Sequence, residues 1–199
     1  MTPVQAIIAK ELRSYFVSPV VYVVGAVFLL IVGLLAYLYL VFAGAQAIQL
    51  MQVQGSAQLN LNDLVFRNLF ASMRFILLII LPILTMRLFA EERKLRTFEF
   101  LLTSPIGINE IVAGKFMSVF LVFLSLLGLT GLMPLMLALF SDFDWYPVLT
   151  GYLGLVLLGA LFLSVGVLAS ALTENQIVAA FVSIGLLLVL WLLSGLGAL

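Results

Sequence analysis

The chain has 199 residues, of which 65% are hydrophobic and only 9% are charged, whereas about a quarter of the residues in an ordinary soluble domain are charged. Nine basic residues balance nine acidic ones, so the net charge gives no reason to expect a nucleic acid as a partner. Cysteine and histidine are absent, which removes disulfides, thiol nucleophiles, the usual general base and the commonest zinc ligands. This composition predicts an integral membrane protein and argues against an enzyme.

The first sixteen residues predict an amphipathic helix in the membrane interface rather than a cleaved signal peptide. Thr2, Pro3 and Gln5 have the arrangement of a capped helix start. Apolar residues recur on one helical face from Val4 to Phe16, largely opposite the charged residues Lys10, Glu11 and Arg13. A turn is expected at Ser18-Pro19, before the first long apolar run.

Five apolar runs are long enough to cross a bilayer, which takes about 20 residues per helix. The runs are Val17–Ala43, Leu69–Phe89, Phe116–Phe140, Val148–Leu172 and Ile177–Leu199. The sequence therefore predicts an all-α integral membrane protein, with five transmembrane helices in a single domain over residues 1–199. Pro82 and Pro134 are expected to kink the second and third of these helices.

Arg74 is the charged residue that we single out within a predicted span. Two interpretations stay open. Its guanidinium could face a translocation path or pair with an acidic group of a substrate. Alternatively, it lies near the outer interface and extends to the lipid headgroups.

Basic residues flank the spans unevenly, and this asymmetry predicts the orientation. With the N-terminus in the cytoplasm, the inner side carries seven basic residues and the outer side only Arg67 and Arg74. The segment 90–115, between the second and third spans, is then cytoplasmic. No metal site is predicted.

The charged segment at 91–104 has the pattern of a short amphipathic helix that ends near Pro105. Its apolar residues recur at helical spacing, at Leu95, Phe98, Leu101 and Leu102. One interpretation is a surface that docks a soluble partner. The other is a solvated connector held by internal pairs such as Glu92–Arg96. Gly107 to Lys115 is not a phosphate loop, because Phe116 stands where the pattern requires Ser or Thr, so nucleotide hydrolysis belongs to a separate polypeptide.

Two parts of the sequence carry a family resemblance that covers essentially the whole chain. The first is Lys10-Glu11-Leu12-Arg13 with Ser18-Pro19. The second runs from Ala90-Glu91-Glu92-Arg93 through Thr97, Glu99 and Leu101-Leu102-Thr103-Ser104-Pro105 to Gly114-Lys115. Together they resemble the permease subunit of type-2 ABC exporters, closest to the gliding-motility-associated branch. The resemblance implies the bacterial inner (plasma) membrane as the location.

In that family, the segment between the second and third spans carries a coupling helix that lies in a groove of the cytoplasmic ATPase. The resemblance implies the same role here, with these candidate contacts: Glu91, Glu92, Arg93, Arg96, Phe98, Glu99 and Leu102. It also implies a cytoplasmic ABC ATPase that holds ATP and Mg²⁺, and a second permease subunit in a homodimer or heterodimer. Such permeases usually have six spans, so a sixth helix is expected and the sequence is expected to be truncated before it.

Three classes of function are compatible with these features. The first is the permease of an ATP-driven exporter, which requires a cytoplasmic partner and explains the charged segment. The second is an ion-coupled carrier or channel, which usually has ionisable residues in the middle of the membrane. The third is a non-transporting assembly or anchoring subunit. We favour the exporter permease.

Overall fold

The computed structural model describes residues 2–54, 62–95, 107–140 and 143–196, and within these ranges every regular element is helical. The elements are α1 (Pro3–Val17), α2 (Pro19–Gln54), the π-helix η1 (Asn62–Phe66), α3 (Arg67–Thr85), α4 (Arg87–Lys94), α6 (Ile108–Thr130), α7 (Leu132–Leu137), α8 (Trp145–Leu172) and α9 (Gln176–Leu196). The predicted all-α fold is confirmed.

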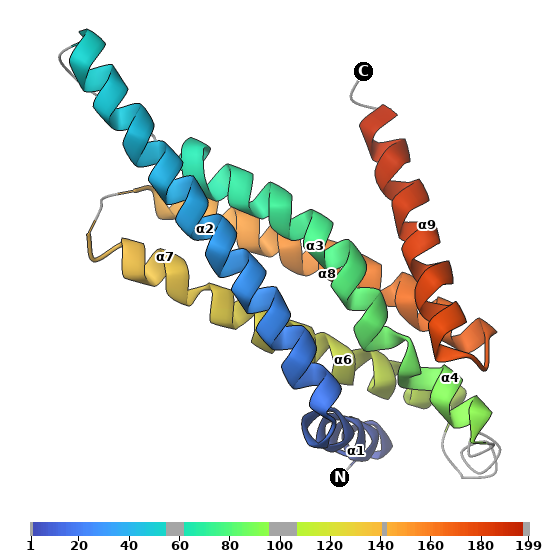
Figure 1. Cartoon of the computed structure of the whole chain (residues 1–199). Coiled ribbons are helices and arrows are strands. Elements are labelled where there is room, and N and C mark those ends of the chain that lie inside the picture. Colours follow the sequence, from blue (N-terminus) through green and yellow to red (C-terminus); the bar gives the residue numbers. More distant parts are fainter. Residues whose placement is uncertain (1, 55–61, 96–106, 141–142, 197–199) are drawn as a thin grey trace.

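Five stretches of helix are long and apolar enough to cross a membrane. They are Pro19–Leu50, Asn62–Lys94, Ile108–Leu137, Trp145–Leu172 and Gln176–Leu193. Figure 1 shows α3 and α8 side by side, with α1 crossing the lower end of the bundle near α2 and α6. The predicted number of five is confirmed, and the described residues contain no sixth helix of this kind.

Several helices extend beyond the apolar runs of the sequence. The first continues to Gln54, through the polar residues that follow Ala43, and the third begins at Ile108 rather than near Phe116. The second runs on through α4 to Lys94. Helical hydrogen bonding therefore continues past the ends of the hydrophobic runs, because polar and charged residues such as Gln, Glu and Lys are good helix formers.

The start of α1 matches the expected capped helix. The Thr2 hydroxyl accepts a hydrogen bond from the Gln5 backbone N–H at 3.4 Å, and the Gln5 side-chain oxygen accepts one from the Thr2 N–H at 3.1 Å. This reciprocal pair is a capping box. The helix ends at Val17, and Pro19 begins α2 directly after the extended residue Ser18, as predicted.

The core of the bundle is centred on α3, which packs against α2, α8 and α9. Its buried apolar residues recur every three or four positions, at Leu69, Met73, Leu77, Leu81 and Leu84. The helix is interrupted at Met86, four residues after Pro82, and α4 begins at Arg87. A proline disturbs the turn before it, whereas this break comes after Pro82, and the Met86 N–H still donates to the Pro82 carbonyl at 2.9 Å. The kink predicted at Pro82 therefore stays a prediction.

Three glycines of α8 allow neighbouring helices to approach closely. A Cβ atom at Gly151 would overlap the ring of Phe70, one at Gly159 would overlap the ring of Phe123, and one at Gly166 would overlap the Thr85 side chain. Their spacing of eight and seven residues places them on one face of the helix. Small residues permit this kind of close contact between membrane helices, where van der Waals packing drives association.

Replacing Gly166 by alanine is expected to lower the free energy of unfolding by about 1–3 kcal/mol, because the new methyl group overlaps the buried Thr85 side chain. The matched control is Gly154→Ala on the same helix, where a Cβ would meet no atom within 4 Å. Thermal unfolding of the purified protein in detergent measures both variants. Equal midpoints for the two variants would contradict the packing that we describe.

Candidate functional site

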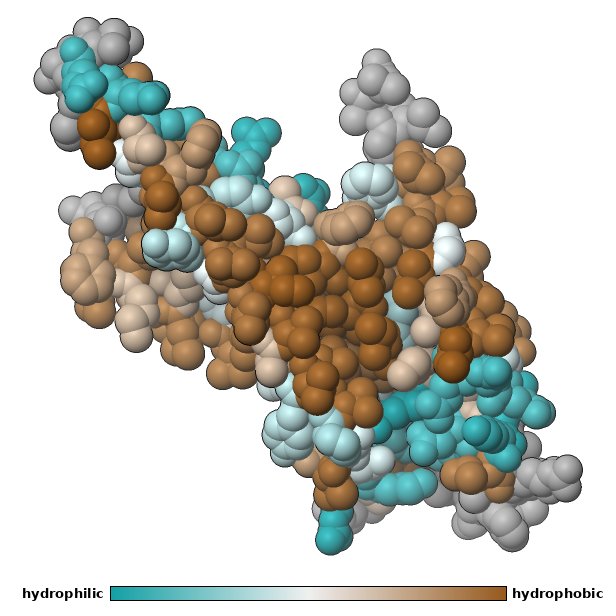
Figure 2. Space-filling model, viewed as in Figure 1, coloured by the Kyte–Doolittle hydropathy of each residue, from teal (hydrophilic) through white to brown (hydrophobic). Residues whose placement is uncertain are grey.

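Charged residues from α1, α4 and α6 meet at one end of the bundle. Figure 2 shows hydrophilic side chains gathered over α4, against a largely hydrophobic surface over α2, α3 and α9. A cavity of about 260 Å³ lies between the three helices, and six charged residues line it: Lys10, Glu11, Arg87, Glu91, Glu92 and Lys115. In a chain so poor in charge, this concentration marks the candidate functional site.

Lys115 is the centre of this cluster. Its Nζ atom lies 2.9 Å from Glu11 Oε1 on α1 and 2.9 Å from Glu92 Oε1 on α4. It also donates a hydrogen bond to the Leu88 carbonyl oxygen at 2.7 Å and lies 5.2 Å from the centre of the Phe89 ring. One ammonium group therefore connects three helices through two ion pairs and a backbone hydrogen bond.

The Lys115 ion pairs are well shielded from solvent. The Lys115 side chain is 2% exposed, and the side chains of Glu11 and Glu92 are each 13% exposed. Such a pair contributes modest net stability but becomes strongly destabilising when one partner is removed, because the other charge stays buried. A second cation, Lys10, lies 3.7 Å from Glu92 but is 67% exposed, so its contribution is small.

The approach of α1 to α6 depends on Gly114, the residue before Lys115. A Cβ atom at this position would lie 2.8 Å from Ile7 Cγ2 on α1. Glycine therefore lets α1 pack directly against α6, and this contact brings Glu11 within reach of Lys115. Glu11 was expected largely opposite the apolar face of the first helix. This is wrong for Glu11, which turns toward the bundle and binds Lys115.

Tyr15 and Arg87 form a second contact between α1 and the second long helix. The Tyr15 hydroxyl donates a hydrogen bond to the Leu84 carbonyl oxygen at 2.8 Å, and the Arg87 guanidinium carbon lies 4.4 Å from the centre of the Tyr15 ring. Burial raises the pKa of Tyr15 above its ordinary value of 10.0, and the positive charge of Arg87 opposes this only in part.

The raised pKa of Tyr15 predicts a loss of stability at alkaline pH. Because the folded-state pKa exceeds the unfolded one, the stabilisation is complete below about pH 10 and is lost as pH rises through the folded-state pKa. The unfolding midpoint of Tyr15→Phe is therefore expected to fall less steeply above pH 10 than that of the unsubstituted protein. The control is Tyr37→Phe, an exposed position. Parallel pH profiles for all three proteins would contradict this prediction.

The start of α4 is capped by a side chain from another helix. The first turn of any helix has N–H groups without helical partners, and the Met86 side chain does not cap α4. Ser170 of α8 does so instead. Its hydroxyl oxygen accepts hydrogen bonds from the Phe89 and Ala90 N–H groups, at 3.1 and 3.2 Å, and donates one to the Met86 carbonyl at 2.9 Å.

The predicted coupling residues are only partly within the described structure. Glu91 and Arg93 are exposed on α4, whereas Glu92 faces Lys115. Arg96, Phe98, Glu99 and Leu102 lie outside the described residues. The segment Glu91–Lys94 forms the end of α4 rather than the start of a separate helix, and Leu95, expected on an apolar stripe, is 63% exposed. These assignments stay predictions.

Arg74 is exposed on α3, beside the face that buries Met73 and Leu77. Its neighbour Phe75 makes an edge-to-face contact with Trp191 of α9, with ring centres 6.1 Å apart. Arg74 does not line the cavity of the charged cluster, and its role stays a prediction.

Sequence reasoning did not identify Lys115, Glu11 and Ser170 as site residues. Lys115 stands at the start of an apolar run, where a basic residue ordinarily marks the edge of the membrane. Two features of the sequence could have indicated the ion pair. Glu11 has the opposite charge to Lys115, and Gly114 has no side chain, which allows α1 to pack closely against α6. Ser170 gave no signal, because a single serine in a membrane helix is common.

These features define a class of protein: a polytopic α-helical membrane protein in which the charged helix α4, at one end of the bundle, makes direct ion pairs and hydrogen bonds with the spanning helices α6 and α8. The chain belongs to the ABC-2 family of transporter proteins, whose sequence profile matches residues 5–198. It is thus a membrane permease of ABC transporters, and this family implies association with an ABC ATPase and with the bilayer. No curated protein and no solved structure matches the sequence.

Proposed function

We propose that this permease belongs to an ATP-driven exporter and receives the motion of a separate cytoplasmic ATPase through residues 91–104. The observation that carries the proposal is the charged site where α1, α4 and α6 meet, since the last turn of α4, Glu91–Lys94, is the start of this segment. Here Glu91, Arg93 and Lys94 present charge to the outside. ATP and Mg²⁺ are bound by the partner.

The attachment of α4 supports this mechanism. On one side, Glu92 and the Leu88 carbonyl bind Lys115 of α6, which also binds Glu11 of α1. On another side, the N–H groups of Phe89 and Ala90 bind Ser170 of α8. A push on the segment after α4 would thus reach two spanning helices through short, buried contacts. A loosely attached connector would absorb the same motion.

The remaining parts of the proposal rest on the sequence. The surplus of basic residues beside α1 and α4 favours a cytoplasmic N-terminus. The quoted residues from Ala90 to Lys115 favour the gliding-motility-associated branch, the bacterial inner membrane and a functional unit with a second permease subunit.

Co-purification from native membranes tests the proposed partner. The tagged chain is solubilised in a mild detergent, and the recovered proteins are identified by mass spectrometry. We expect an ABC ATPase with the unsubstituted chain and its loss with Glu91→Lys combined with Phe98→Ala. Glu92 is left intact, because its substitution would also break the Lys115 ion pair. The control Asp63→Lys makes the same charge change on the exposed surface at the other end of the second long helix.

Two results would contradict the proposal. Recovery of folded permease without any ATPase would favour the assembly subunit or the ion-coupled carrier. Recovery of an ATPase in equal amounts with all three proteins would retain an ATP-driven transporter but place the coupling contacts elsewhere. Size-exclusion chromatography of each variant shows whether it is folded, so that loss of the partner is not confused with loss of structure.

A further inference from the structure

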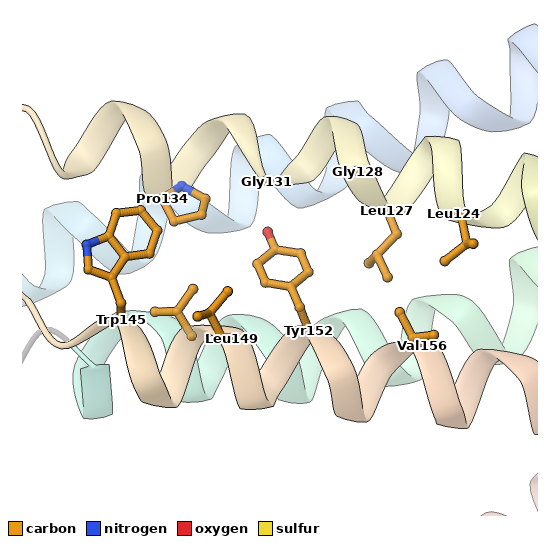
Figure 3. Close-up of a pocket in the computed structure, with 10 residues that line it drawn as sticks. Leu124, Leu127, Gly128, Gly131, Pro134, Trp145, Leu149, Tyr152 and Val156 are labelled. Atoms are coloured by element: carbon orange, nitrogen blue, oxygen red, sulfur yellow. The ribbon is translucent and has the colours of Figure 1, made fainter.

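A groove with almost entirely apolar walls lies between α8 and the consecutive helices α6 and α7, away from the charged site. It has a volume of about 290 Å³. Figure 3 shows that it extends from Trp145 and Pro134 at one end to Leu124 and Val156 at the other. From position 145 to position 156 a helix rises about 16 Å, and about 290 Å³ distributed over that length makes a long, narrow groove.

Two glycines leave space in the wall of the groove that α6 and α7 form, Gly128 in α6 and Gly131 between the two helices. Gly128 and Gly131 both line it, and a Cβ atom at Gly128 would meet no atom within 4 Å. The break between the two helices at Gly131 falls one turn before Pro134, as expected from a proline that cannot donate to the preceding turn.

Water is a poor occupant of this groove. The hydroxyl of Tyr152 points across it toward α6–α7 (Figure 3) and lies 3.2 Å from Thr130 Oγ1. Because Thr130 donates to the Leu127 carbonyl at 2.6 Å, Tyr152 is the donor in this pair and its proton is already used. A bound water molecule needs two to four polar partners, and carbon surfaces do not supply them.

The surroundings of the groove determine what fills it. Both α6–α7 and α8 belong to candidate membrane spans, and Leu149 on its rim is 60% exposed. The groove therefore opens at the depth of the membrane hydrocarbon. Trp145 stands at the first residue of α8, directly after Asp144, and tryptophan prefers the boundary between hydrocarbon and headgroups. One end of the groove thus lies where a headgroup would be.

We propose that this groove binds one acyl chain of a bilayer phospholipid, with the headgroup beside Trp145 and the chain passing Tyr152 toward Leu124. A single hydrocarbon chain suits a long narrow space. A second copy of the chain at this groove is the alternative that the experiment below tests. The bound chain fills the gap between two spanning helices, and the proposal does not depend on the coupling to an ATPase.

A photoactivatable lipid tests the proposal directly. The protein is placed in nanodiscs of phosphatidylethanolamine and phosphatidylglycerol that contain a trace of phosphatidylcholine with a diazirine midway along one acyl chain. After irradiation, labelled peptides are mapped by mass spectrometry. We expect strong labelling of peptides that contain residues 124–134 and 145–156. In the variant Gly128→Phe, labelling of these peptides should be at least about tenfold lower, because the phenylalanine ring occupies the space of the acyl chain.

The matched control is Gly154→Phe, an exposed position of α8 that does not line the groove and where a Cβ meets no atom within 4 Å. It should label like the unsubstituted protein. Equal labelling of Gly128→Phe and Gly154→Phe would overturn the proposal. So would labelling confined to other helices, or cross-links between two copies at the groove. If Gly128→Phe does not fold, Gly128→Leu replaces it. Absence of labelling in residues 124–134 and 145–156 of the unsubstituted protein would also overturn the proposal.

Discussion

Replacing Lys115 by methionine is expected to lower the free energy of unfolding by about 3–5 kcal/mol, because Glu11 and Glu92 then remain as shielded carboxylates without their shared cation. For a chain of this size, each kcal/mol corresponds to about 2–4 °C in the unfolding midpoint, so a decrease of the order of 10 °C is expected. Thermal unfolding in detergent, followed by circular dichroism, measures this change.

Two further variants show whether charge or packing causes the loss. Lys10→Met removes the exposed cation that also lies near Glu92, and it should cost no more than about 1 kcal/mol. The triple variant Lys115→Met, Glu11→Gln, Glu92→Gln removes all three charges of the cluster centre. Since replacing a whole buried ion pair by neutral groups is often close to neutral, it should regain most of the stability lost in Lys115→Met. No recovery in the triple variant would mean that the loss comes from packing or from the Leu88 hydrogen bond, and not from the two ion pairs.

The fold of the spanning region was largely predictable from the sequence, since it follows from local patterns. Apolar runs of sufficient length predicted the five long helices, and Thr2, Pro3 and Gln5 predicted the start of α1. These features depend on residues that are close together in the chain. Hydropathy did not predict where the helices end, because α4 continues through charged residues to Lys94.

The charged site was only partly predictable, because it depends on contacts between distant segments. Lys115 and Glu11 are separated by 104 positions in the sequence, and their ion pair exists because Ile7 packs against Gly114. Each of these residues has an ordinary local explanation: a flanking cation, a surface acid and a small residue in a membrane helix. A pattern confined to one helix cannot show which charge turns inward once the helices pack together.

Ser170→Ala is expected to destabilise the protein by about 1–3 kcal/mol, because the N–H groups of Phe89 and Ala90 lose their buried acceptor. The alanine side chain also leaves the Met86 carbonyl without the hydroxyl donor. Ser164→Ala is the matched control, since Ser164 is on the same helix, is exposed, and its hydroxyl donates only to the Ala160 carbonyl one turn earlier. Thermal unfolding in detergent should separate the two variants by several degrees.

The same pair of variants shows whether Ser170 only stabilises the fold or also transmits motion from α4 to α8. If α4 carries motion to α8 through Ser170, then ATP hydrolysis by the purified complex should respond less to the permease in Ser170→Ala than in Ser164→Ala, at a temperature where both are folded. Ser170→Thr retains a hydroxyl and should restore part of the response if the hydrogen bonds matter. Equal ATPase activities for Ser170→Ala and Ser164→Ala, with a difference in unfolding midpoint alone, would limit Ser170 to capping α4.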